Sequence, residues 1–135
     1  MKELTVEWLK SAQDDLLLIE SIEDKERLTH MIAFYSQQSI EKALKAILFE
    51  FENQTPKIHS IASLFDRVSK YIKLDIEDSL NNELDKLYID SRYPGDIGLL
   101  PNGKPSIKDA DNFYQYAKTI SSQITVFLNR PKAVI

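Results

Sequence analysis

The sequence predicts an all-α protein folded as an up-and-down bundle of four or five helices. Apolar residues recur at three- and four-residue spacing in five separate segments, which is the period of an amphipathic helix. Proline and glycine separate several of these segments, and none alternates with the two-residue period of a strand. A chain of 135 residues without internal repeats fits one domain, which we expect to span residues 1–135.

The first helix is expected over residues 5–22, with Thr5 as its N-cap. Leu17 and Leu18 lie off its apolar stripe, so they are either scattered surface leucines or part of a subunit interface. Asp15 lies at the edge of the stripe, where we expect it to face water; the alternative is a pair with a basic residue of the next helix. The stripe itself comprises Trp8, Leu9, Ala12, Leu16 and Ile19.

The second helix, over residues 28–52, is predicted to be the centre of the bundle. Apolar or small residues occupy most of its circumference, so it must contact neighbours on two sides. Its small side chains would let another helix approach closely. The widest stripe comprises Ile32, Ser36, Ser39, Ile40, Ala43, Ala46 and Ile47. The remaining polar strip, expected to be a solvated helix face, comprises Gln38, Glu41, Lys42 and Lys45.

Three shorter patterns complete the bundle. The second helix must end before Pro56, and Ser60 is expected to cap a third helix with an apolar stripe from residue 61 to residue 72. Asp75 is expected to cap a fourth helix that ends near residue 92. Residues 93–105 hold all three glycines and three of the five prolines, which predicts an irregular loop of unusual length.

The last helix carries the most regular stripe of the chain. It should begin after Ser106, which forms a capping-box pattern with Asp109, and it should end before Pro131. We expect Tyr114 and Tyr116 at the edge of the core, with hydroxyls that reach water or a neighbour. The stripe comprises Ala110, Phe113, Ala117, Ile120, Ile124, Phe127 and Leu128.

Composition excludes several classes of function. The absence of cysteine rules out disulfides and thiolate metal sites, and the two histidines and scattered acids show no metal-ligand spacing. A net charge of -4 argues against a broad electrostatic grip on nucleic acid. No apolar run reaches the ~18 residues of a membrane span, and the first residues do not read as a signal peptide. We therefore expect a cytoplasmic protein without cofactor, metal or membrane contact.

Four stretches of the chain form a recognisable combination: Trp8 with Ala12, Asp15 and Leu16; YSQQSIEKALKAIL at residues 35–48; PKIHSIASL at residues 56–64; and Arg92-Tyr93-Pro94. Together they resemble the HEPN domain family (higher eukaryotes and prokaryotes nucleotide-binding). The resemblance implies a helical bundle that is usually a homodimer. It also implies frequent pairing with a small nucleotidyltransferase in a toxin-antitoxin-like system, and either ribonuclease activity, nucleotide binding or scaffolding.

The ribonuclease members of that family carry an arginine followed by four to six residues and a histidine. Histidine can exchange a proton near neutral pH, while arginine neutralises charge on the phosphate oxygens. Here His30 follows Arg27 too closely, no arginine precedes His59 at that distance, and no histidine follows Arg92. We therefore expect no catalytic residues of this kind.

The candidate ligand-binding residues are Lys42, Lys45, His59, Arg92 and Tyr93. His59 either makes a local hydrogen bond to a backbone group or contacts a phosphate. Arg92 either complements the helix dipole or recognises phosphate or RNA, with Tyr93 stacking on a base. The leading hypothesis is a dimeric module that binds a nucleotide, RNA or a partner nucleotidyltransferase. The alternatives are a metal-independent ribonuclease that uses His59 and Arg92, and a plain dimerisation protein.

Overall fold

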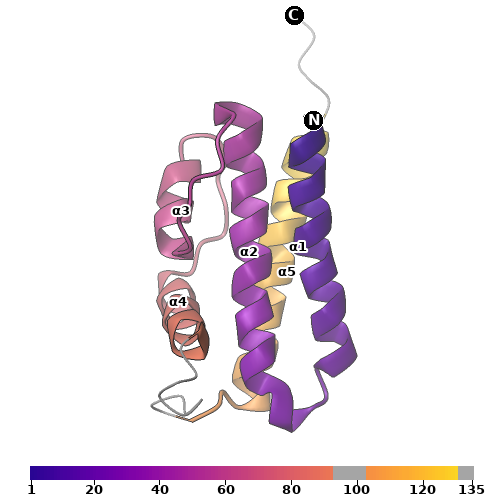
Figure 1. The fold of residues 1–135 in the computed structure, drawn as a ribbon, viewed down its shortest axis with the longest axis vertical. Coiled ribbons are helices and arrows are strands. Elements are labelled where there is room, and N and C mark those ends of the chain that lie inside the picture. The colour runs from indigo at the N-terminus through magenta and orange to yellow at the C-terminus, as the bar shows by residue number, and fades with distance from the viewer. Residues whose placement is uncertain (93–102, 131–135) are drawn as a thin grey trace, which may run out of the picture.

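The computed structural model describes residues 1–92 and 103–130, and it confirms the all-α prediction. Its elements are α1 (Glu3–Ile22), the short 3-10 helix η1 (Glu26–Leu28), α2 (Thr29–Glu52), α3 (Ile61–Val68), α4 (Asp78–Arg92) and α5 (Ile107–Asn129). No strand occurs in these residues. Figure 1 shows α1, α2 and α5 side by side as three long helices, with α3 and α4 on the opposite side of α2.

Helix α2 is the centre of the bundle, as the sequence predicts. It packs against each of the other four α-helices, and none of residues 29–50 is exposed. Ser39 and Ala43 are fully buried, and the Ser39 hydroxyl donates a hydrogen bond of 2.8 Å to the backbone oxygen of Ala12 on α1. Small side chains therefore bring the two backbones close together, as expected.

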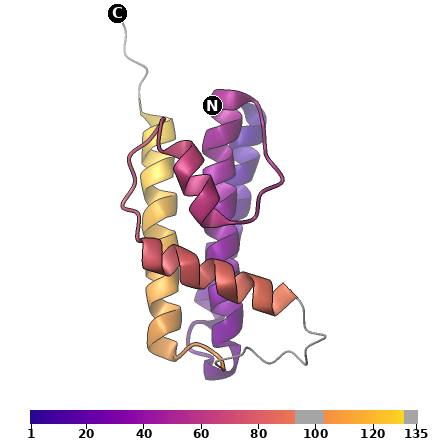
Figure 2. The same cartoon turned by 90° about the vertical axis from the view of Figure 1, so that its left-hand side faces the viewer.

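The two short helices depart from a simple up-and-down arrangement. Figure 2 shows α4 lying across α2 and α5 instead of alongside them. Leu84, which is fully buried, anchors α4 to the core. Because α4 crosses α2, its C-terminal end lies beside α2. Residues distant in sequence are in contact there.

Two of the predicted caps are correct. The hydroxyl of Ser60 accepts a hydrogen bond from the backbone N–H of Ser63, and the hydroxyl of Ser106 accepts one from Asp109. At α3, the carboxylate of Asp85 also accepts the backbone N–H of Ile61 at 2.9 Å. A side chain of α4 therefore helps to fix the start of α3.

The other two predicted caps are wrong. Helix α1 begins at Glu3, so Thr5 lies inside it, where its buried hydroxyl donates to Glu50 Oε1 at 2.9 Å. Glu50 also accepts the backbone N–H of Lys2, the residue just before α1, so a carboxylate from α2 holds the start of this helix in place. Helix α4 begins at Asp78, and Asp75 is instead hydrogen-bonded to Gln123 of α5. In both places the side chain predicted to be the cap instead bonds a residue distant in sequence.

Candidate functional site

The polar strip of α2 is not the solvated face that was expected. Glu41 and Lys45 are each only 5% exposed, and Lys45 Nζ lies 3.0 Å from Glu41 Oε2. Lys45 Nζ also lies 5.8 Å from the centre of the Trp8 ring, so α1 covers one side of the pair. The expectation failed because helical periodicity identifies a polar strip but not the side chains that fold over it. Burial of this pair is tolerable because each charge has its partner.

Asp15 was expected to face water, and this expectation is wrong. It is 7% exposed, and its Oδ2 lies 2.9 Å from Lys42 Nζ on α2. The alternative, a pair with a basic residue of the next helix, is what the structure shows. Burial raises the pKa of the Asp15 carboxyl even though Lys42 opposes that shift. Lys42 is therefore paired with a carboxylate, as Lys45 is.

His59 lies beside the Glu41–Lys45 pair. Its ring Nδ1 is 3.4 Å from both carboxylate oxygens of Glu41, and 47% of its side chain is exposed. Among the residues that the structure describes, the ring bonds no backbone group, although the backbone oxygen of His59 accepts a hydrogen bond from Gln37. The structure thus joins His59 to α2 through Glu41, a residue that the sequence-based site left out.

The end of α4 approaches the same cluster. The Tyr88 ring lies 5.9 Å from the His59 ring and stacks on Phe34 of α2 at 5.6 Å. Arg92 is the last residue of α4, one helical turn beyond Tyr88, and Tyr93 lies outside the described residues. The structure therefore brings Lys45 and His59 together and places Lys42 on the same strip, while contacts of Arg92 and Tyr93 stay a prediction.

A second stripe on α1 lies next to this cluster. Its members recur at alternating spacings of four and three residues, the spacing of a helix–helix contact. They are Leu4, Trp8, Ser11, Asp15, Leu18 and Ile22. Trp8 and Asp15 contact Lys45 and Lys42, so this stripe borders the α2 strip, and we call the two together the α1–α2 face. Leu18 belongs to it and is 41% exposed, whereas Leu17 points elsewhere and is 63% exposed.

The chemistry available at this face is limited. Both lysines have carboxylate partners, and His59 presents a ring that is 47% exposed beside them. No group of three metal-ligating side chains forms within residues 1–92 and 103–130. Sequence reasoning missed Glu41, Trp8 and Tyr88 as members of the cluster. The four-residue spacing of Glu41 and Lys45 indicated their pairing but not the arrival of His59.

Comparison with known proteins adds a family and a fold. A family model of the HEPN domain matches residues 5–124. Among solved structures, the protein TT1696 from Thermus thermophilus is similar with a TM-score of 0.74 and 24% sequence identity, over 92% of this chain and 98% of that one. At this identity the likeness shows the fold. No curated protein matched, and no described helix combines the length and the apolar character needed to cross a membrane.

Proposed function

Because the chain belongs to the HEPN domain family, we propose that it is a homodimeric module that binds a nucleotide or RNA without catalysis. Domains of this family generally dimerise and serve as nucleotide-binding or ribonuclease-type modules. The observation that carries the proposal is the α1–α2 face. On this face, an apolar stripe of α1 lies beside charged side chains that are already paired with one another.

This face suits a second copy of the same chain for two physical reasons. Leu4 and Leu18 are large apolar side chains left exposed on it, and burying such surface favours association. Within each of the two pairs, Asp15–Lys42 and Glu41–Lys45, the charges cancel. Two identical faces would therefore not repel each other. A twofold interface requires such self-complementarity.

Charge substitution at the two adjacent leucines tests the dimer. Leu18→Glu should weaken self-association about tenfold or more, because a carboxylate would be buried at the interface. Leu17→Glu is the matched control and should leave the dimer intact, since Leu17 lies off the α1–α2 face. Sedimentation equilibrium measures both. A monomeric wild type at micromolar concentration, or equal effects of the two variants, would contradict the proposal.

The ligand is proposed to bind at the His59 edge of the α1–α2 face, with Lys42, Lys45, Arg92 and Tyr93 as the other candidate residues. Support comes from the exposed His59 ring and from the path of α4, which ends one turn beyond Tyr88. Binding of labelled ATP and of a short RNA should fall in His59→Ala and in Arg92→Ala. Unchanged affinity in both variants would exclude this edge, and a partner nucleotidyltransferase would become the alternative occupant.

A ribonuclease is the second candidate, and the His59–Glu41 contact favours it. A histidine oriented by a carboxylate is a common general base or acid. Such an enzyme would cleave RNA in the presence of EDTA, because no metal would take part. Cleavage should then disappear in His59→Ala and in Arg92→Ala. Cleavage that persists in both variants would come from a contaminant and would exclude this activity.

A further inference from the structure

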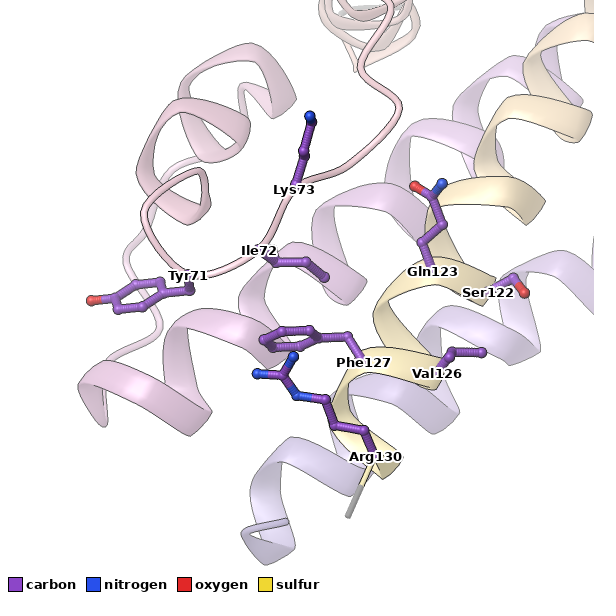
Figure 3. Close-up of a pocket in the computed structure, with 8 residues that line it drawn as sticks. All are labelled: Tyr71, Ile72, Lys73, Ser122, Gln123, Val126, Phe127 and Arg130. Atoms are coloured by element: carbon purple, nitrogen blue, oxygen red, sulfur yellow. The ribbon is translucent and has the colours of Figure 1, made fainter. Parts of the chain in front are cut away.

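A pocket of about 700 Å³ lies on a different side of the bundle, between residues 71–73 and the C-terminal half of α5. Figure 3 shows Ile72 facing Phe127 across its floor, with Arg130 folded over the Phe127 ring and Lys73 rising at the rim. Small-molecule sites typically enclose roughly 300–1,000 Å³. The size therefore suits a small organic ligand.

The walls of this pocket are held in place by tertiary contacts. The Gln123 amide donates to Asp75 Oδ2 at 2.7 Å and accepts from the Asp75 backbone N–H at 3.1 Å, which fastens the segment before α4 to α5. On the other side, Phe51 stacks on Tyr71 at 4.9 Å and lies 6.0 Å from Phe127. These contacts hold the walls of the pocket in place, which reduces the ordering cost of binding.

The two charged side chains that line the pocket, Lys73 and Arg130, are both positive. Within the described part of the chain, neither Lys73 nor Arg130 has a carboxylate within ion-pair distance, in contrast to Lys42 and Lys45. The nearby Glu52 is occupied by Arg67 and Lys70. The Asp75 carboxylate, the other local acid, accepts a hydrogen bond from Gln123, which lies at the opposite end of the pocket from Arg130.

Arg130 is also oriented for anion binding. Its guanidinium carbon lies 4.1 Å from the centre of the Phe127 ring, so a cation–π contact positions the group at the pocket. A guanidinium held on a ring keeps N–H groups at its edge for a bidentate contact with phosphate. Ser122, exposed on the pocket wall, adds a hydroxyl donor.

We propose that this pocket binds a small organic phosphate, with Arg130 and Lys73 holding the phosphate and Ile72, Phe127 and Val126 contacting a partly apolar body. Apolar surface is available for that body, because Val126 lines the pocket and is exposed. The site goes beyond the proposed function: it lies apart from the α1–α2 face and does not require a dimer.

Isothermal titration with AMP, adenosine and inorganic phosphate tests the site. AMP should bind more tightly than either fragment, because it supplies both the phosphate and the body. Arg130→Gln should weaken AMP binding about tenfold or more, and Lys73→Gln should weaken it less. Lys118→Gln is the matched control: Lys118 is also an exposed cation of α5 beside an aromatic ring, Tyr114, but outside the pocket. It should change the affinity less than about twofold.

Two results would overturn the site. One is AMP affinity unchanged in Arg130→Gln, and the other is equal binding of adenosine and AMP. Loss of AMP binding in His59→Ala, with Arg130→Gln unaffected, would place the nucleotide at the α1–α2 face instead. That outcome would reject this pocket while supporting the proposed function, so failures of the two proposals can be distinguished. Because Arg130 is exposed beyond the end of α5, its substitution should not unfold the chain.

Discussion

Tyr116 is a single side chain whose hydroxyl joins two elements. Its Oη donates to Asn81 Oδ1 at 2.6 Å and accepts from the Glu77 backbone N–H at 3.3 Å, where α5 meets the start of α4. Burial raises the pKa of this hydroxyl to about 12, so it stays protonated across the physiological range. Tyr116 and Asn81 are both buried, so neither can exchange this bond freely for water.

Removing that hydroxyl should therefore destabilise the fold. Tyr116→Phe leaves the buried Asn81 amide without its donor, which should lower the free energy of unfolding by about 1–3 kcal/mol. Urea denaturation measures the loss. Tyr114→Phe is the control: its hydroxyl bonds Glu20, which is exposed and can turn to water, so its cost should be smaller. Equal losses in the two variants would contradict this account.

Glu52 should give the stability a pH dependence. A hydrogen bond from Tyr71, aided by Lys70 and Arg67, lowers the pKa of this carboxyl below its ordinary 4.5. A depressed carboxyl contributes stability that is present above its unfolded pKa and is lost as pH falls through its folded pKa. Glu52→Gln should therefore lower the melting temperature at pH 7, and the difference from wild type should shrink as pH falls below 4.5.

Thermal unfolding between pH 7 and pH 3 measures this effect. Glu83→Gln is a suitable control, because Glu83 is exposed on α4 and makes no hydrogen bond or ion pair among the described residues. It should shift the melting temperature little at any pH. A constant difference between Glu52→Gln and wild type across the range would mean that the carboxylate charge does not contribute.

At the scale of the elements, α2 depends on its small residues. Ala43 is fully buried in the core, so a larger side chain there would push neighbouring helices apart. Ala43→Leu should cost about 1–3 kcal/mol of unfolding free energy by overpacking, measured by urea denaturation. Ala62→Leu, at a half-buried position of α3, should change it by no more than about 0.5 kcal/mol. If Ala43→Leu leaves the unfolding free energy unchanged, the packing around this position is loose and the prediction is wrong.

The limits of sequence reasoning are visible in α1. Its period correctly predicted a buried stripe, but Trp8 was assigned to that stripe although it belongs to the neighbouring one, against Lys45. The same period could not reveal that Glu50, a residue from α2, would accept hydrogen bonds from Thr5 and from the backbone N–H of Lys2. Local spacing specifies which side of a helix is apolar. It does not specify which distant side chain arrives there.

For the whole molecule, the bundle and its central helix could be predicted because α2 is apolar around most of its circumference. The candidate site could be predicted only in part. The sequence singled out Lys45 and His59, and the structure brings them together, but through Glu41. It could not reveal that Lys42 and Lys45 are already paired, because the partner of Lys42 comes from α1. Paired in this way, the two lysines have little charge left for phosphate, which is the reason that we propose this face for association.

The central claim is that two copies meet through the α1–α2 face, and Trp8 reports on it directly. Trp8 is the only tryptophan of the chain and lies half-buried within that face. Acrylamide quenching of its fluorescence should be weak in concentrated samples, where a second copy shields it, and should strengthen on dilution as the dimer dissociates. Quenching independent of concentration, over a range in which sedimentation shows dimers dissociating, would contradict the account and place the interface elsewhere.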